Sequence, residues 1–166
     1  MKSFGLSTIQ IVKINIIAIG KKLPEWISNG IHHYEKQLPK HLNFKIIQLE
    51  PQNRKKQNIA KVKEIEGEML LKEAENSNIL IAMDENGQQK STIDLKDSLN
   101  QWSQNGDNVS IIIGGADGLS SRCLEASSEK WALSRLTLPH SVARLLITEQ
   151  LFRAYTLTIN HPYHRE

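Results

Sequence analysis

The chain has 166 residues, of which 39% are hydrophobic and 23% charged, and its formal net charge is +3 at pH 7. A chain of this length and composition can bury a sizeable core and is ordinary for a globular protein, so we do not expect a disordered chain. Its one cysteine, Cys123, excludes an internal disulfide and favours a reducing compartment. Gln10, Lys13 and Asn15 interrupt the apolar run at residues 9–19, so we expect neither a signal peptide nor a membrane span, and a cytoplasmic protein.

The N-terminal half alternates between strand and helix patterns. A β-branched run at residues 11–19 predicts a first strand that ends at Gly20. Pro24 fits the first turn of a helix that reaches about residue 37. Residues 44–49 predict a second strand, and a polar, basic loop follows at residues 51–57. Apolar residues at helical spacing then predict a long amphipathic helix over residues 59–75.

The C-terminal half continues the alternation. A short strand at residues 79–83 is closed by a turn-like segment at 84–87, and Ser91 or Thr92 can cap a helix that reaches about residue 102. Residues 109–113 are typical of a strand buried on both faces. A short helix at 120–128, a strand at 131–138 and a helix at 141–158 complete the pattern. This order predicts an α/β domain with a mostly parallel sheet flanked by helices.

The first segment with chemical potential is Gly114-Gly115-Ala116-Asp117-Gly118-Leu119, which directly follows the buried strand. In α/β sheets, ligands bind beyond the carboxyl ends of the strands, and glycine lets a ligand approach the main chain. The alternative is a tight turn that only needs a positive φ. The glycines alone do not decide between the two, since they match neither a dinucleotide fingerprint nor a P-loop.

The second segment is the run at residues 133–140, which ends in Pro139 and His140. Proline cannot donate to a sheet ladder, so we expect the strand to stop there, with main-chain groups free to bind a ligand. The alternative is an edge strand that simply leaves its sheet.

The third segment is the C-terminal run Asn160-His161-Pro162-Tyr163-His164-Arg165-Glu166. Tyr and His rings can stack on an unpaired base, and Arg can bind phosphate. The alternatives are a dimer contact or a solvated end. The histidines at 140, 161 and 164 have no accompanying thiol or carboxylate pattern, so we predict no metal site. Glu149 and Arg153 are expected to form an i,i+4 ion pair.

Together, and in this order, the three segments resemble the knotted SPOUT methyltransferases. The likeness covers residues 12–166 and includes residues 20–26, whereas residues 1–11 stand outside it as an N-terminal extension. The terminal seven residues are its most specific part. The resemblance implies one knotted methyltransferase domain over residues 12–166, with a trefoil knot in its C-terminal third, in an obligate homodimer.

The resemblance also implies which residues bind and react. A pocket for S-adenosyl-L-methionine would be lined by Met83, Gly114, Gly115, Leu133, Ser134, Arg135, Leu136, Thr137 and Leu138. Arg144, Tyr163, His164 and Arg165 would face the RNA, partly from the other subunit. For catalysis, Arg144 or Arg165 could stabilise negative charge on the target nitrogen, and His140 or His164 could take its proton. Positioning alone could also supply much of the rate.

Among SPOUT enzymes, the likeness is greatest to small members that methylate N3 of a pseudouridine in large-subunit ribosomal RNA. We therefore expect an S-adenosylmethionine-dependent rRNA methyltransferase that acts on the assembled ribosome. One alternative is a knotted methyltransferase that acts on tRNA. The other is a non-catalytic ribosome-binding protein that uses the C-terminal tail and the basic loop around Arg54.

Overall fold

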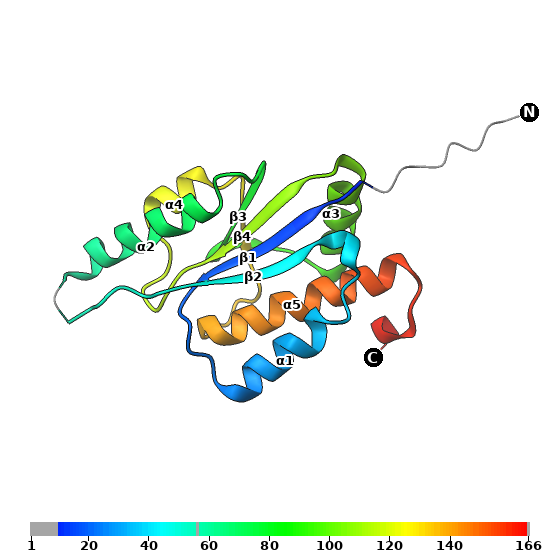
Figure 1. The fold of residues 1–166 in the computed structure, drawn as a ribbon, viewed down its shortest axis with the longest axis horizontal. Helices are drawn as coiled ribbons and strands as arrows, with labels where there is room; N and C mark the ends of the chain where they lie inside the picture. Colours follow the sequence, from blue (N-terminus) through cyan, green and yellow to red (C-terminus); the bar gives the residue numbers. More distant parts are fainter. Residues whose placement is uncertain (1–9, 56, 166) are drawn as a thin grey trace, which may run out of the picture.

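The computed structural model describes residues 10–55 and 57–165. Within them, five parallel strands form one sheet in the order β2-β1-β4-β3-β5 (Figure 1). The strands are β1 (Lys13–Ile19), β2 (Phe44–Leu49), β3 (Ile79–Gln89), β4 (Asn108–Ile113) and β5 (Glu129–Ala132). The helices are α1 (Glu25–Glu35), α2 (Ile59–Glu73), α3 (Thr92–Asn105), α4 (Ser121–Ala126) and α5 (His140–Thr158), with short 3-10 helices at Lys40–Leu42 and Pro162–Arg165. The predicted α/β class with a parallel sheet is confirmed.

Helices cover both faces of the sheet. Helices α1, α3 and α5 pack on one face, while α2 and α4 lie on the other (Figure 1). The inner strand β1, which lies between β2 and β4, accordingly contributes side chains to two apolar clusters. Ile14 and Ile16 pack in the cluster that includes α3 and α5 residues, and Ile17 and Ile19 in the cluster that includes Leu70 of α2. Burial on both faces explains why the sequence of this strand is continuously apolar.

Strand β3 runs past the turn that the sequence predicts after Met83. The register shifts there, so that Met83 and Gln88 both lie opposite Trp131 of β5. A Cβ atom on Gly87 would lie 2.7 Å from the carbonyl carbon of Lys130, so this close approach requires glycine. The turn-like residues 84–87 thus lie within the longer strand β3, where they cause the shift in register.

Strand β5 is shorter than the sequence predicts. It ends at Ala132, which lies opposite Gln89, the last residue of β3. Because β3 goes no further and β5 is an edge strand, residues 133–138 have no neighbouring strand to pair with. They form an irregular segment instead, which we call the β5–α5 loop.

The sequence predicts an N-terminal extension at one end of the chain and an RNA-facing tail at the other. Most of the expected N-terminal extension, residues 1–9, lies outside the described residues, and Gln10 and Ile11 precede β1. The C-terminal tail forms the 3-10 helix Pro162–Arg165, which packs back on α5 (Figure 1). The trefoil knot stays a prediction. In the described part of the chain, no helix is long and apolar enough to cross a membrane.

Candidate cofactor and RNA site

Glycines follow the two neighbouring central strands where each reaches the same edge of the sheet. Gly20 comes directly after β1, and Gly114 directly after β4. Gly20 has a φ of 109°, which side-chain-bearing residues rarely adopt. A Cβ atom on Gly114 would lie 2.6 Å from the carbonyl carbon of Gly118, so the loop closes too tightly for any side chain. Both glycines therefore shape the edge where parallel sheets bind ligands.

Arg144 of α5 is tied to the end of β1. Its Nη1 donates to the carbonyl oxygen of Gly20 at 2.8 Å, and its Nη2 donates to the carbonyl oxygen of Ile19. The side chain is 0% exposed, and burial lowers the pKa of its guanidinium. Its Nε has no partner among the described residues. The structure therefore does not support the prediction that Arg144 faces RNA, because its guanidinium has no accessible surface.

His140 is the first residue of α5, and it lies beside the same glycine. A Cβ atom on Gly20 would be 3.8 Å from Nε2 of His140. Burial lowers the pKa of His140, and the positive charges of Arg144 and Arg54 lower it further. The imidazole therefore favours its neutral form, in which one nitrogen can accept a proton.

The β5–α5 loop offers main-chain groups to a ligand. Within residues 134–138, the N–H of Leu136 donates to Oγ of Ser134 at 2.9 Å. The other main-chain groups of these five residues have no hydrogen-bond partner in the described part of the chain. Leu136 itself is 74% exposed. An exposed leucine next to unpaired N–H and C=O groups suits a planar ligand with polar edges.

The side chains predicted for the cofactor pocket are divided between partly buried and exposed positions. Met83 and Leu133 both pack against the apolar cluster under α3 and α5. Arg135, Leu136 and Thr137 are exposed on the loop. The residues predicted to line the cofactor pocket thus include side chains packed on the core and side chains exposed on the loop, and the pocket itself stays a prediction.

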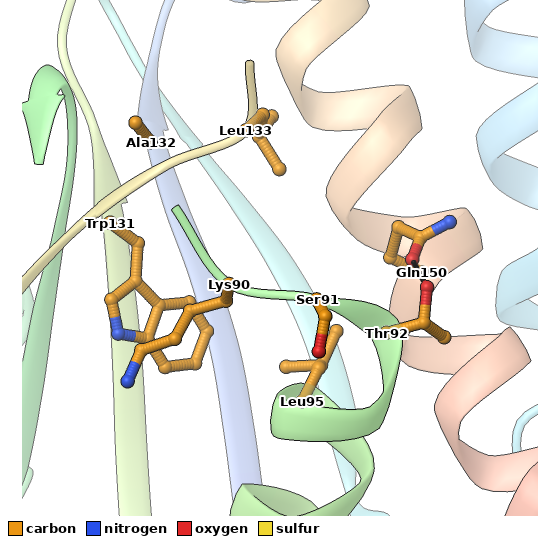
Figure 2. Close-up of a pocket in the computed structure, with 8 residues that line it drawn as sticks. All are labelled: Lys90, Ser91, Thr92, Leu95, Trp131, Ala132, Leu133 and Gln150. Carbon is orange, nitrogen blue, oxygen red and sulfur yellow. Dashed lines mark hydrogen bonds between the residues drawn. The ribbon is translucent and has the colours of Figure 1, made fainter. Parts of the chain in front are cut away.

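A cavity of about 420 Å³ adjoins the start of this loop. It lies between the first turn of α3, the end of β5 and α5, and Leu133 is its one member from the predicted cofactor set (Figure 2). Its polar groups are largely satisfied within the protein: Oγ1 of Thr92 donates to Oε1 of Gln150 at 2.7 Å, and the Lys90 amine lies 3.3 Å from a Glu129 carboxylate oxygen. The lining residues are Lys90, Ser91, Thr92, Leu95, Trp131, Ala132, Leu133 and Gln150.

The glycine loop after β4 is anchored by a residue that lies far away in the sequence. Nε of Arg54 donates to Oδ2 of Asp117 at 2.8 Å. Arg54 is therefore paired with a carboxylate of its own chain, although its side chain is 36% exposed, and this pairing weakens the alternative in which Arg54 leads a ribosome-binding loop. Sequence reasoning missed this pair because the two residues stand 63 positions apart and no local pattern links them.

The C-terminal tail packs more tightly than a solvated end would. The Tyr163 hydroxyl lies 3.0 Å from Oε1 of Glu149 and 3.2 Å from the Tyr34 hydroxyl. Its ring contacts Phe152, and the Arg153 guanidinium lies 4.7 Å from its centroid. Burial first, then the bonds to Tyr34 and Glu149, raise the pKa of Tyr163. The packing of Tyr163 does not fit the alternative of a solvated end. The predicted pair of Glu149 and Arg153 is confirmed at 2.8 Å.

The predicted reactive residues at the sheet edge and those in the C-terminal tail lie apart within one chain. His140 begins α5, whereas Tyr163 packs around Glu149, nine residues later and about 14 Å along the helix axis. His164 is half-buried and its Nδ1 has no partner among the described residues, while Arg165 is exposed. Within one chain, His140 and Arg144 thus lie at the end of β1, and the tail residues Tyr163, His164 and Arg165, which we call the tail cluster, lie further along α5.

Comparison with known proteins identifies the family. The sequence model described as "Predicted SPOUT methyltransferase" matches residues 12–164. A protein from Saccharophagus degradans named "Ribosomal RNA large subunit methyltransferase H" is 44% identical over 155 residues, which cover 93% of this chain and all of that protein. A protein of the same name from Methylobacillus flagellatus is 38% identical over 156 residues, with the same coverage. The chain belongs to the SPOUT methyltransferase family.

The fold agrees with solved structures of more distant proteins. A methylase family protein from Neisseria gonorrhoeae superposes with a TM-score of 0.55 at 14% identity, covering 92% of this chain and 85% of that one. At this identity the likeness concerns the fold alone.

Proposed function

We propose that this protein transfers the methyl group of S-adenosylmethionine to N3 of a pseudouridine in large-subunit ribosomal RNA. Family membership supports methyl transfer from this donor, and the names of the relatives support ribosomal RNA of the large subunit as the substrate. The observation that carries the site is the β5–α5 loop: in the described part of the chain, every main-chain group of residues 134–138 except the Leu136 N–H lacks a hydrogen-bond partner. The turn at Gly114, which leaves no room for a Cβ atom, lies at the same edge of the parallel sheet.

The residues at this edge fit the donor. S-adenosylmethionine supplies an electrophilic methyl group on a sulfonium, together with an adenine that has hydrogen-bonding edges. The main-chain N–H and C=O groups of residues 134–138, apart from the Leu136 N–H, can bind those edges, and Leu136 and Leu138 can cover the ring. Gly114 and Gly115 keep side chains out of the space beyond β4.

Two residues of the chain would assist the transfer, one by accepting a proton and one by positioning the first. The target nitrogen carries a proton that must leave as the methyl group arrives. His140 is suited to accept it, because its lowered pKa favours the neutral imidazole. Arg144 has a different role from the one expected, that of a positioning residue: it binds the main chain of Ile19 and Gly20 and thereby fixes the start of α5, where His140 stands.

The RNA would be bound by the tail cluster of a second subunit. Arg165 supplies an exposed cation, and His164 a half-buried imidazole. The 14 Å or so between His140 and the tail cluster along α5 supports a composite site, with the donor held by one subunit and the RNA by the tail of its partner. Trp26 of α1 and Leu146 of α5 are 64% and 37% exposed, and these apolar side chains are candidates for the homodimer interface. A ribosomal substrate implies a cytoplasmic enzyme.

A complementation experiment tests this proposal. His140→Ala and Arg165→Ala proteins are each assayed with tritiated S-adenosylmethionine on ribosomes from a strain that lacks the gene, and then as mixed dimers. If the site is composite, mixing restores a fraction of the activity, because one of the two sites regains both residues. Activity that stays absent on mixing contradicts the composite site, and an active monomer by light scattering contradicts the dimer.

The same assay separates the alternatives. Methyl transfer to tRNA and none to ribosomes would favour the tRNA enzyme. No measurable heat with S-adenosylmethionine in calorimetry would favour a non-catalytic ribosome-binding protein. Mass mapping of the methylated rRNA then tests N3 of pseudouridine as the target.

A further inference from the structure

A buried carboxylate lies directly beneath the glycine loop after β4. Glu66 of α2 is 2% exposed. Its Oε1 accepts a hydrogen bond from the main-chain N–H of Gln52 at 3.0 Å and lies 3.7 Å from Nη2 of Arg54. Arg54 in turn binds Asp117 of the loop. One guanidinium thus connects helix α2, the segment after β2 and the glycine loop.

The second oxygen of this carboxylate points at the loop and lacks a partner. Oε2 of Glu66 is buried and makes no hydrogen bond in the described part of the chain. A Cβ atom on Gly115 would lie 3.0 Å from this oxygen and 3.1 Å from Nη2 of Arg54. A buried, half-satisfied carboxylate destabilises a fold, because hydration is lost without full replacement. A function of the negative charge of Glu66 at the glycine loop would explain why a carboxylate is buried at this position.

The charges around this edge are otherwise unfavourable for a cationic ligand. Arg54 lies against Gly115, and Arg144 is buried at the end of the neighbouring strand. Arg144 carries its positive charge in a region of low dielectric, where charges are poorly screened, whereas the side chain of Arg54 is 36% exposed and partly screened by solvent. Asp117 is paired with Arg54 and partly solvated, with 22% of its side chain exposed. Glu66 is the carboxylate that is both buried and in reach of Gly115.

The methyl donor changes charge in the reaction. S-adenosylmethionine carries a positive sulfonium; loss of its methyl group leaves S-adenosylhomocysteine, whose sulfur is a neutral thioether. We propose that Glu66 is a specificity-determining residue, whose buried charge beneath Gly115 favours the sulfonium donor over its neutral product. This inference rests on the proposed donor position at the glycine loop. Glu66 acts through the loop and the local charge balance and touches neither the methyl group nor the RNA.

The test compares the affinities of donor and product in full-length variants. Calorimetry at pH 8 gives the Kd of S-adenosylmethionine and of S-adenosylhomocysteine for the unmodified protein and for Glu66→Gln, which removes the charge and keeps the shape. We expect the donor to bind about tenfold more weakly and the product to stay within about twofold. The matched control is Glu68→Gln, because Glu68 lies on the same helix but is exposed and paired with Arg122; it should change neither Kd.

Removing the opposing charge gives an independent measurement with the opposite sign. Arg54→Gln releases Asp117 and can weaken both ligands, but it should shift the ratio of the two Kd values toward the donor. Equal weakening of donor and product by Glu66→Gln would overturn the inference and leave donor binding intact. If Glu66→Gln does not fold, an unchanged ratio in Arg54→Gln overturns it. Absence of donor binding in the unmodified protein would overturn the proposed donor site as well.

Discussion

The guanidinium of Arg144 binds the carbonyl oxygen of Gly20 at 2.8 Å, across 124 residues of sequence. The contact fastens the first turn of α5 to the end of β1, which is a central strand of the sheet. A cation that donates to main-chain carbonyls in the protein interior is oriented by them and, in turn, fixes their direction. The position of His140, one turn earlier on α5, depends on this contact.

Replacement of Arg144 should therefore affect folding before it affects RNA binding. We expect Arg144→Ala to lower the free energy of unfolding by about 3 kcal/mol, because two buried carbonyl groups lose a charged donor and a gap remains. Urea denaturation measures this change. Arg122→Ala serves as the control, since its side chain is 67% exposed, and it should cost less than about 1 kcal/mol. A stable Arg144→Ala protein that has lost only RNA affinity would restore the RNA-facing role.

The lowered pKa of His140 makes stability depend on pH. The unfolded chain binds a proton at this position more readily than the folded chain does, because burial and two arginines oppose the charge. Stability from this residue is fully present above the ordinary imidazole pKa of about 6.5 and falls as the pH drops below it. His140→Gln should therefore lose less stability than the unmodified protein between pH 7.5 and pH 5.5.

Urea midpoints at these two pH values, with a reference at pH 8, measure the effect. At pH 8 the imidazole is neutral in the folded and the unfolded chain, so a difference in urea midpoint between His140→Gln and the unmodified protein at this pH reports packing alone. If both proteins lose the same stability on acidification, the environment assigned to His140 is incorrect.

The fold follows from the sequence wherever the pattern is local. The apolar run of β4 and the cap at Ser91 each predict their element to within a few residues. Ser91 even completes its capping box with Asp94. These signals involve residues a few positions apart, so they can be recognised without the tertiary structure.

The errors come from contacts between distant segments. The end of β5 is set by where β3 runs out, at Gln89, and not by Pro139. The burial of Arg144 depends on carbonyl groups at the end of β1, and the pairing of Arg54 depends on Asp117 in the glycine loop. The packing of Tyr163 is not predicted either, because nothing in the last seven residues indicates Tyr34 or Glu149 as its partners.

Gly114 allows a direct test of the donor site. Its Cβ would meet the main chain of Gly118 at 2.6 Å, so even Gly114→Ala must displace the loop. We expect at least tenfold weaker binding of S-adenosylmethionine in calorimetry, with a retained circular dichroism spectrum, because the loop lies at the end of the strand. Ala116→Ser, at an exposed position of the same loop, should bind the donor normally. An unchanged affinity of Gly114→Ala for S-adenosylmethionine would show that the donor does not bind at this loop.

The tail provides the last prediction, which separates RNA contact from packing. Arg165 is exposed, so we expect Arg165→Ala to keep its stability within about 0.5 kcal/mol and to bind the methyl donor normally. If Arg165 contacts a phosphate, the variant should bind ribosomes more weakly, and its affinity should depend less steeply on salt by about one counterion. Lys72→Ala, another exposed cation on the α2 side of the sheet, controls for net charge and should change neither quantity.

In contrast to Arg165→Ala, Tyr163→Phe should lower the stability and leave ribosome binding unchanged. It keeps the ring against Phe152 but removes the hydroxyl bonds to Glu149 and Tyr34, so it should cost about 1 kcal/mol of stability, measured by urea denaturation. Ribosome binding is measured by filter retention at several salt concentrations for all three variants. Equal salt slopes for Arg165→Ala and the unmodified protein would remove Arg165 from the RNA site. A loss of ribosome binding in Lys72→Ala as large as that in Arg165→Ala would show that net charge, and not the tail, governs the interaction.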